Sequence, residues 1–329
     1  MLNNENFLSD RIFSGDAEKK SLRDGFGEGL LDLGENNPKV VALSADLKES
    51  TRCHWFAEKF PERFFEIGVA EQNMAAIAAG LGISGKIPFI CSYAVFSPGR
   101  NWEQIRTTIA YNDSNVKIAG HHAGLSAGPD GATHQAVEDI ATMRAMPNMK
   151  VIVPCDAVEA KKATVAAAKI WGPAYIRLAR EKTPEMTTEK TKFVPQKAYA
   201  MWESKKPQVA IIGAGPILYQ ALLAAKELDS EKIGVVVLNS HTIKPIDGKK
   251  ITEVAKECGA VVTVEEHNVI GGLGSAVAEV LAKNYPVPME FVGINDVFGE
   301  SGNPEELLKK YGLDANHIKE AVKKAMRRK

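Results

Sequence analysis

The sequence has no excess of charge of either sign. Lys and Arg together number 41, and Asp and Glu also number 41, so the formal net charge is zero. Chains that bind nucleic acids or acidic membrane surfaces through long-range attraction usually carry a clear basic excess. The balance of charge therefore argues against both kinds of partner.

Cysteine is also scarce, and its four occurrences lie far apart in the chain, at Cys53, Cys91, Cys155 and Cys258. No two of them have the spacing of a zinc site or of a redox-active pair. Scattered cysteines are typical of reduced thiols in a reducing compartment. We therefore expect a cytoplasmic protein, with no metal site built from this chain.

Long hydrophobic runs are absent as well. No apolar stretch reaches the roughly 20 residues that span a membrane. Residues 1–6, Met-Leu-Asn-Asn-Glu-Asn, lack the basic start and apolar core of a signal peptide. Because there are also no short-period repeats or low-complexity segments, we expect an ordinary globular chain.

The 329 residues are enough for two domains. After an irregular polar arm at residues 1–20, short apolar runs alternate with helical segments through residues 21–185. The predicted strands are 39–44, 64–66, 86–91, 115–120, 150–153 and 174–178, and one of the predicted helices is 99–111. Because strands that alternate with helices form parallel sheets covered on both faces, we predict an α/β domain here.

The alternation stops at residues 186–206, which are rich in Lys, Thr, Glu and Pro and which we expect to form a linker. A second unit, residues 207–329, alternates strands at 209–212, 234–238, 261–265 and 290–293 with helices that begin near residues 217, 248, 274, 304 and 316. The predicted fold class is α/β with two domains, the second being smaller and built on a mostly parallel sheet.

One carboxylate lies at the start of a predicted apolar helix. A short strand ends near Ile67, Gly68 turns the chain, and a helix of mostly small apolar residues opens at Glu71. The helix N-terminus favours the anionic form of Glu71, whereas burial favours its neutral form. Such a carboxylate can share a proton with a ligand nitrogen, although a first-turn Glu that only complements the helix dipole is the commoner arrangement.

Polar and aromatic residues collect where the predicted strands end. Ligands of open parallel sheets bind beyond the carboxyl ends of the strands, and that edge receives acids, aromatic rings, histidines and an arginine. They are Asp46, Ser50, Glu71, Tyr93, Phe96, His121, His122, Asp130, His134 and Arg180. This set is typical of a polar substrate site.

Each of these residues also has a purely structural explanation. Tyr93 and Phe96 are three residues apart, a spacing that more often reflects core packing than a stacking platform. The histidines of the glycine-rich loop 121–134 could bind a metal, but no helical pair has ligand spacing. Arg23, on the first helix, is the weakest candidate by pattern. The glycines at 213–215 and 271–274 indicate tight turns, because neither group has the full order of a dinucleotide fingerprint.

With these residues laid out, the chain resembles transketolase over about residues 17–325. Residues 68–74, Gly-Val-Ala-Glu-Gln-Asn-Met, look like the start of its pyrimidine-binding domain. Residues 43–47 (Leu-Ser-Ala-Asp-Leu) and 128–135 (Gly-Pro-Asp-Gly-Ala-Thr-His-Gln) are similar to two further motifs, in the family order. Residues 242–247, 265–268 and 271–272 resemble its C-terminal domain. Taken together, these motifs are specific to enzymes that use thiamine diphosphate.

The resemblance implies that residues 21–185 are the pyrimidine-binding domain and that residues 207–329 are the C-terminal domain of transketolase. We find no counterpart of the domain that holds the cofactor's diphosphate and Mg²⁺ in that family, so the chain resembles the C-terminal subunit of a split transketolase. The implied partners are a separate N-terminal subunit and a second copy of this chain, in a dimer of heterodimers. The implied activity, absent from the isolated chain, transfers a two-carbon ketol unit between ketose and aldose phosphates in the pentose phosphate pathway.

The resemblance assigns cofactor roles position by position. Glu71 matches the glutamate that hydrogen-bonds the aminopyrimidine of thiamine diphosphate and thereby helps to form the ylide nucleophile. Tyr93 and Phe96 match aromatic residues around the pyrimidine, and Gly99 stands where the family commonly has a third. Asp46 matches an aspartate near the cofactor and the substrate hydroxyls.

The substrate positions transfer in the same way. Asp130 matches the residue that recognises sugar stereochemistry, and His134 matches a histidine that contacts substrate hydroxyls and moves protons during carbon–carbon cleavage. The phosphate-binding set of the family, whose charge-assisted bonds would anchor a sugar phosphate, corresponds to Arg23, Ser50, His122 and Arg180. Ala132 stands where the family usually has a proline.

Three other functions fit parts of the pattern. The beta subunit of a 2-oxo acid dehydrogenase has a similar length and the same pair of domains, but that enzyme needs no clamp for a sugar phosphate. Deoxyxylulose-phosphate synthase shares several motifs, but its substrates include pyruvate and its single chain is whole. A non-catalytic paralogue is the third alternative, and the retention of Glu71, Asp130 and His134 argues against it.

Overall fold

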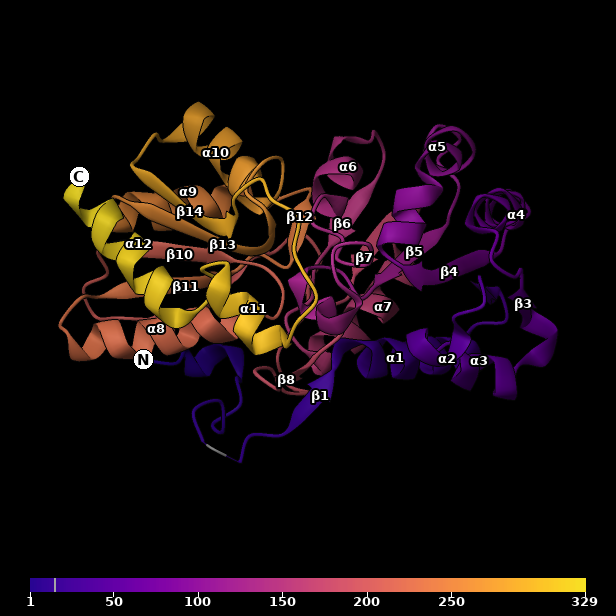
Figure 1. Cartoon of the computed structure of the whole chain (residues 1–329), viewed down its shortest axis with the longest axis horizontal. Helices are drawn as coiled ribbons and strands as arrows, with labels where there is room; N and C mark the ends of the chain where they lie inside the picture. The colour runs from indigo at the N-terminus through magenta and orange to yellow at the C-terminus, as the bar shows by residue number, and fades with distance from the viewer. Residues whose placement is uncertain (15) are drawn as a thin grey trace.

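The computed structural model describes residues 1–14 and 16–329. Figure 1 shows two α/β units side by side, the N-terminal half in indigo and magenta and the C-terminal half in orange and yellow. Each unit is built on its own sheet, and both sheets carry helices on two faces. The predicted α/β fold class, with a smaller and mostly parallel second sheet, is confirmed.

The first sheet has the strand order β12-β6-β7-β5-β4-β2-β3. Neighbouring strands run parallel from β6 to β3, while β12 runs antiparallel to β6. The strands are β2 (Val40–Ser44), β3 (Phe64–Glu66), β4 (Ile87–Tyr93), β5 (Lys117–His121), β6 (Lys150–Ile152), β7 (Ala174–Arg177) and β12 (Thr242–Lys244). The carboxyl ends of the parallel strands therefore meet at one edge, directly before the loops that carry the candidate site residues.

Alternate residues of each strand face opposite sides of this sheet. In β2, Val40 and Ala42 join one apolar cluster, whereas Val41 and Leu43 join another. One side carries α1 (Leu22–Asn36), α2 (Lys48–Thr51), α3 (His54–Lys59) and α7 (Ala157–Lys169), and the other carries α4 (Glu71–Ile83), α5 (Trp102–Gln104) and α6 (Asp139–Ala145). Because both faces are covered, the strands read as continuous apolar runs.

The second sheet has the strand order β14-β13-β10-β11-β9, in which β9 is antiparallel to β11 and the other pairs are parallel. Its strands are β9 (Tyr199–Glu203), β10 (Val209–Gly213), β11 (Val235–Asn239), β13 (Val261–Asn268) and β14 (Met289–Ile294). Its helices are α8 (Leu218–Ser230) and α12 (Ala315–Arg327) on one face, and α9 (Gly248–Cys258) and α10 (Leu273–Asn284) on the other. Within the described residues, no helix is both long and apolar enough to cross a membrane.

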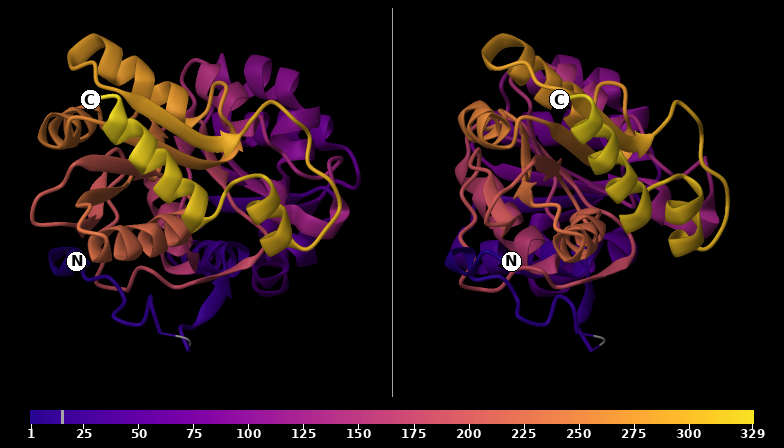
Figure 2. Two further views of the ribbon diagram at one scale, coloured as in Figure 1. Left: turned by 60° about the vertical axis from the view of Figure 1, so that its left-hand side comes forward. Right: turned by 90° about the vertical axis from the view of Figure 1, so that its left-hand side faces the viewer.

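The apolar core is continuous between the two halves. One cluster contains Leu43 and Ile90 from the first sheet together with Ile212 and Leu238 from the second. A further helix, α11 (Pro304–Lys310), leaves the second sheet and lies against the short helical turn at Leu125–Asp130 of the first half. Figure 2 shows this yellow helix beyond the edge of its own sheet. The C-terminal half therefore reaches the loops at the carboxyl edge of the first sheet.

Several short strands were not predicted from the sequence. In the polar arm, β1 (Lys19–Ser21) pairs with β8 (Lys182–Pro184), and β9 lies inside the segment that we expected to be a linker. β12, although it comes from the C-terminal half, extends the first sheet. Each of these strands pairs with a distant part of the chain, so no local pattern indicates it.

The helix predicted at residues 99–111 is not continuous. Two π-helical turns, Val95–Arg100 and Ile105–Ala110, flank the single turn of α5. Pro98 lies inside the first of them, and proline has no backbone N–H to continue a regular helix. This irregular path follows Tyr93 and sets the directions of Phe96 and Arg100.

A buried ion pair lies next to the carboxyl edge of the first sheet, and its arginine also bonds to the C-terminal half. Arg177, at the end of β7, donates from Nε to Asp139 Oδ2 at 2.8 Å, and Tyr175 donates its hydroxyl to the same oxygen at 2.6 Å. Arg177 Nη2 also donates to the carbonyl of Glu266 in the C-terminal half, at 2.8 Å. Burial alone would raise the pKa of Asp139, but Arg177 outweighs it, and the pKa lies below the ordinary 3.8.

Asp139→Asn should lower the free energy of unfolding by about 3–5 kcal/mol at pH 7, because it leaves the buried Arg177 cation without a counter-charge. The lowered pKa of Asp139 adds stability above pH 3.8 that is lost as the pH falls through the folded-state value. The deficit of the variant should therefore shrink in acid. Urea denaturation at several pH values measures this deficit. The control is Asp32→Asn, which removes the carboxylate of a half-exposed ion pair. Equal deficits in the two variants would contradict the prediction.

The close approach of α1 and α7 depends on a glycine. A Cβ built on Gly25 would overlap the carbonyl of Ala157, which is backbone and cannot turn away. Gly80, on the outer side of α4, has nothing within 4 Å of the same position. The two helical glycines are therefore held by different constraints.

Gly25→Ala should destabilise the isolated chain by about 1–3 kcal/mol through overpacking. Gly80→Ala should instead stabilise it by about 0.5–1 kcal/mol, because alanine loses less backbone entropy in a helix. Thermal or urea unfolding at one protein concentration compares the two variants. The same sign for both would refute the proposed origin of the Gly25 constraint.

Candidate active site

Glu71 is the first residue of α4 and is nearly inaccessible, with 2% of its surface exposed. Gly68, at a φ of 73°, makes the turn that leads from β3 into this helix. Arg100 Nη1 donates to Glu71 Oε2 at 2.7 Å, and Asn101 Nδ2 donates to the backbone carbonyl of Glu71 at 3.0 Å. The structure thus places a buried carboxylate at a helix N-terminus, with a cation that is 47% exposed as its partner.

Aromatic rings form a wall beside this carboxylate. Tyr93, at the end of β4, stacks on Phe96 with ring centroids 5.9 Å apart and planes 18° apart. The ring of His122 lies 4.0 Å from that of Tyr93, and His134 approaches Phe96 edge-on at 5.4 Å. Two rings from the 93–96 turn and two from the 121–134 loop therefore share one surface.

Arg100 extends this wall next to Gly99, the position at which the family commonly has a third aromatic residue. Its guanidinium carbon lies 4.5 Å from the centroid of Phe96, a cation–π geometry. The same guanidinium pairs with Glu71. Arg100 therefore links the carboxylate to the aromatic surface.

The cations of the site surround His122. Arg23 Nη1 lies 3.5 Å from His122 Nε2 and also donates to the carbonyl of Ser50 at 3.3 Å. Arg180 Nη1 donates to the carbonyl of Ala127 at 2.6 Å and lies 3.9 Å from Asp130 Oδ2. The structure thus brings Arg23, the Ser50 backbone and His122 together, and it places Asp130 next to Arg180.

The electrostatics of this cluster suit an anion. Burial, together with Arg23, Arg180 and other nearby cations, lowers the pKa of His122 to about 3, so the ring is neutral at physiological pH. Among the described residues, Arg23 Nε and His122 Nδ1 are buried without a hydrogen-bond partner. Unpaired donors beside two guanidinium groups can receive the oxygens of a phosphate.

Two sequence candidates lie apart from this cluster. The backbone N–H of Asp46 donates to Glu66 Oε1 at 2.7 Å, and its side chain is exposed at a φ of 61°. His121 points to the opposite side of β5 and packs edge-on against Phe26, with centroids 4.9 Å apart. Asp46 therefore lies on the neighbouring turn, and His121 belongs to the core.

Sequence reasoning missed several residues that the structure brings to the site. Arg100 and Asn101 hold Glu71, yet they stand in a stretch where only the aromatic residues attracted attention. Glu266 and Gln135 support the loop that carries Asp130, through contacts described below. The pairing of Glu266 with Ser126 spans 140 residues, so no local spacing could have revealed it.

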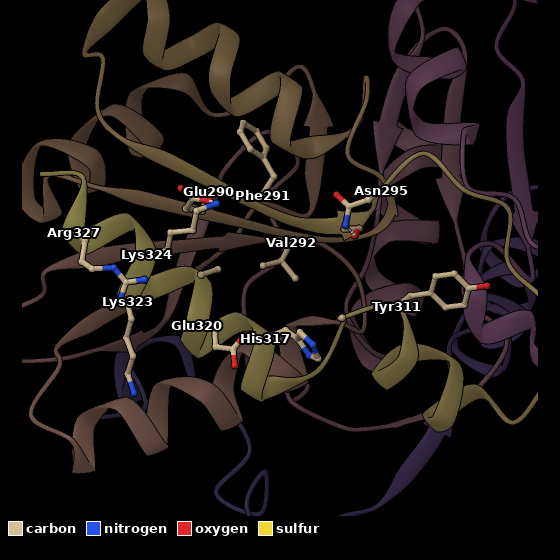
Figure 3. Close-up of a pocket in the computed structure, with 13 residues that line it drawn as sticks. Glu290, Phe291, Val292, Asn295, Tyr311, His317, Glu320, Lys323, Lys324 and Arg327 are labelled. Carbon is tan, nitrogen blue, oxygen red and sulfur yellow. Dashed lines mark hydrogen bonds and ion pairs between the residues drawn. The ribbon is translucent and has the colours of Figure 1, made fainter.

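A hollow of about 470 Å³ lies in the C-terminal half, between β14 and α12. Figure 3 shows the residues that line it. Lys324 lies 2.7 Å from Glu290, and Lys323 lies 2.6 Å from Glu231. Because these lysines already have anionic partners, the hollow is less suited to a phosphate than the cluster around His122. Within residues 1–14 and 16–329, no group of three His, Cys, Asp or Glu side chains is placed to hold a metal ion.

Comparison with known families identifies both halves of the chain. The transketolase pyrimidine-binding domain matches residues 18–186, and the transketolase C-terminal domain matches residues 198–318. A Methanocaldococcus jannaschii protein, provisionally named a transketolase C-terminal section, is 45% identical over 94% of this chain and 97% of its own length. A Clostridium sp. protein named a 6-deoxy-6-sulfo-D-fructose transketolase subunit is 40% identical over 96% of this chain and 98% of its own length.

Solved structures agree with these matches. One that is described as a split gene transketolase, in an inactive β4 tetramer, superposes with a TM-score of 0.88 at 49% identity and covers 94% of this chain and 99% of that chain. The human and rat transketolases each match 93% of this chain but only 49% of their own length. Since two family domains account for most of its residues, this chain belongs to the transketolase family.

Proposed function

We propose that this chain is a subunit of a thiamine-diphosphate-dependent transketolase, which moves a two-carbon ketol unit from a ketose phosphate to an aldose phosphate. One observation carries the proposal. The buried carboxylate of Glu71 opens α4, and Arg100 joins it to the stacked rings of Tyr93 and Phe96, because its guanidinium pairs with Glu71 and lies over Phe96. A carboxylate next to an aromatic wall fits a flat, nitrogen-containing ring that both stacks and shares a proton.

The aminopyrimidine of thiamine diphosphate fits this pocket. Tyr93 and Phe96 would pack against the ring, and Glu71 would hold a proton shared with a ring nitrogen. When bound, the cofactor supplies a carbon nucleophile that no protein side chain offers. Arg100 now occupies Glu71 Oε2, and because its side chain is 47% exposed it can release the carboxylate without disrupting the core.

The cluster around His122 would hold the phosphate of the sugar. Arg23 and Arg180 supply fixed positive charge, and the neutral His122 supplies an N–H donor. The backbone carbonyl of Ser50 accepts from Arg23, and the hydroxyl of Ser50 would add a further donor. Asp130 and His134, on the loop that follows, would bind the hydroxyls of the sugar, with His134 as the group that moves protons. Asp46 would contribute from the neighbouring turn.

A partner subunit would complete this site. The chain corresponds to half of the human and rat transketolases, and a Clostridium relative is itself named a subunit. Exposed apolar side chains on and beside α4 offer a docking face, and they include Val69, at 71% exposure, and Ile83, at 67%. We propose that an N-terminal subunit holds the diphosphate and Mg²⁺, that the enzyme is a dimer of heterodimers, and that this chain alone is inactive. A similar solved chain is described as an inactive tetramer.

The choice of sugar is a separate part of the proposal. We propose pentose phosphates as substrates, which would place the enzyme in the pentose phosphate pathway. The relative named for a sulfosugar indicates that the sugar differs among similar subunits. The domain limits at residues 21–185, 186–206 and 207–329 and a cytoplasmic location remain predictions from the sequence.

The beta subunit of a 2-oxo acid dehydrogenase remains the alternative. Its substrates carry a carboxylate but no sugar phosphate. The cations around His122 and their unpaired buried donors favour the phosphate substrate.

Glu71→Gln should reduce ketol transfer in the assembled pair by at least about 100-fold, because an amide cannot share a proton with the pyrimidine. The assay uses xylulose 5-phosphate and ribose 5-phosphate with thiamine diphosphate and Mg²⁺, for this chain alone and with its N-terminal subunit. Glu62→Gln, at an exposed carboxylate, serves as the control. Ketol transfer by the isolated chain would contradict the proposal. So would turnover of a 2-oxo acid, in place of ketol transfer, by the chain paired with its N-terminal subunit.

Arg180→Gln should raise the KM for the sugar phosphate about 10- to 100-fold, since a hydrogen bond to a charged group contributes about 1.5–3 kcal/mol. The KM for the corresponding unphosphorylated sugar should rise less, because Arg180 acts on that sugar only through the loop that carries Asp130. Arg327→Gln, in the hollow of Figure 3, removes an arginine that the proposed site does not use. A larger effect from Arg327→Gln than from Arg180→Gln would move the phosphate site to the C-terminal half.

A further inference from the structure

The loop between β5 and α6 carries Asp130 and His134, but it has little structure of its own. Gly124, Gly128 and Gly131 all have positive φ, at 86°, 67° and 73°. Backbone of this kind has many alternative conformations, and fixing each residue costs about 1–2 kcal/mol. Contacts from elsewhere must hold residues 124–135 in place, and besides Arg180, which donates to the carbonyl of Ala127, the C-terminal half supplies them.

Glu266 makes the first of these contacts. It lies near the end of β13, is 4% exposed, and accepts from the backbone N–H of Ser126 through Oε1 at 2.5 Å. A Cβ on Gly124 would come within 2.5 Å of the same oxygen, so the carboxylate fits only against a glycine. The backbone carbonyl of Glu266 accepts from Arg177, which fixes this residue relative to β7.

Gln135 makes the second contact, from the other end of the loop. Its Nε2 donates to the carbonyl of Glu300 in the C-terminal half at 3.1 Å. The same nitrogen lies within hydrogen-bond distance of two loop carbonyls, those of Leu125 at 3.3 Å and Gly128 at 3.2 Å. One amide group therefore joins both ends of the loop to the segment that precedes α11.

That segment also fixes the shape of the loop by direct packing. A Cβ on Gly131 would come within 2.5 Å of Ser301 Oγ, and a Cβ on Gly128 within 2.9 Å of Pro304 Cγ. α11, which begins at Pro304, lies against the turn at Leu125–Asp130. Figure 2 shows α11 as the yellow helix that projects from the second sheet. Residues 299–304 and Glu266 thus pack against the side of the loop that faces the C-terminal half.

We infer that the C-terminal domain positions residues 124–135, here called the substrate loop, and that Glu266 is the residue on which this positioning depends. The inference rests on the proposed function, because it assigns Asp130 and His134 to the substrate. Glu266 itself faces the back of the loop, so it is a positioning residue and does not touch the sugar. Its removal would free Ser126 and widen the range of positions open to Asp130 and His134.

The contact needs an acceptor rather than a charge. The Oε1 atom of a glutamine side chain could accept from the Ser126 N–H just as the carboxylate does. Alanine at position 266 would leave a buried N–H without a partner. Glu266→Gln and Glu266→Ala therefore separate the positioning contact from the mere presence of a charge.

The kinetic test uses the assembled pair with thiamine diphosphate and Mg²⁺. Glu266→Ala should lower kcat/KM for the sugar phosphates about 10- to 100-fold, with a raised KM, because small misplacements of binding groups cost rates of that order. The affinity for thiamine diphosphate should not change. Glu266→Gln should stay within about threefold of the wild type. Glu279→Ala is the control, because it deletes an exposed carboxylate that pairs with Arg144 across the two halves, away from the loop.

Hydrogen exchange of the intact, isolated chain tests the positioning without any need for activity. Peptides that cover residues 124–135 should exchange at least about tenfold faster in Glu266→Ala than in the wild type, while Glu266→Gln and Glu279→Ala should match the wild type. Gln135→Ala should show the same acceleration and gives a second route if Glu266→Ala does not fold.

The kinetic and exchange measurements distinguish a failure of the proposed function from a failure of the inference about Glu266. If the wild-type pair has no ketol-transfer activity, the proposed function is wrong, and hydrogen exchange alone decides whether Glu266 positions the loop. If the pair is active but Glu266→Ala leaves both loop exchange and KM unchanged, the inference is overturned and the proposed function stands. An equal loss in Glu266→Gln and Glu266→Ala would also overturn it, because the charge would then be the important property.

Discussion

Arg177 is the cation on which the junction between the two halves depends. Its guanidinium is almost completely buried at the end of β7 and donates to Asp139, to the carbonyl of Ala136 and to the carbonyl of Glu266. A buried cation is tolerated only when its partners remain in place. The carbonyl of Ala136 also accepts from Gly124, where the substrate loop begins. One charge thus fixes a strand, a helix of the first half, the start of the loop and the end of β13.

The same rule of compensated charge organises the candidate active site. Glu71 is buried as an acid next to Arg100, and His122 is kept neutral by burial and by the cations around it. Arg23 and Arg180 face that neutral ring, and Arg23 Nε has no partner in the part of the chain that the structure describes. The positions of these charges suit an anion at one end of the site and a proton-sharing ring at the other, as the proposed function requires.

Periodicity and strand order explain how much of this was visible in the sequence. Buried parallel strands such as β2 and β10 are unbroken apolar runs, so they were predicted almost to the residue, and the carboxyl-end rule then located the loops that carry Tyr93, His122 and Arg180. The prediction failed for β9 and β12, because an edge strand of three to five residues is defined by a partner far away in the chain.

The candidate site divides in the same way. Motifs identified Glu71 and the substrate loop, whereas the partners of these residues were not visible. Arg100, which pairs with Glu71, ends an irregular π-helical turn where the sequence predicted an ordinary helix. Glu266 approaches Ser126 across 140 residues. Motifs indicate which residues are candidates to meet a ligand, but the contacts that hold those residues come from tertiary packing.

If Glu71 has the proposed role, its position on α4 would link catalysis to assembly. The inner side of this helix packs Met74, Ala75 and Ala78 into the core, while Ile77 and Ile83 remain exposed on the outer side. A subunit that covers the exposed side chains from Val69 to Ile83 would also reach the turn that precedes Glu71. It would exclude water from the half-exposed Arg100 and from a bound ring, and thereby strengthen the interaction of that ring with Glu71. In the chain alone, the half-exposed Arg100 takes that place. Under the proposed function, a buried acid that is completed only by a partner would explain why this half of the enzyme carries the carboxylate and still depends on assembly.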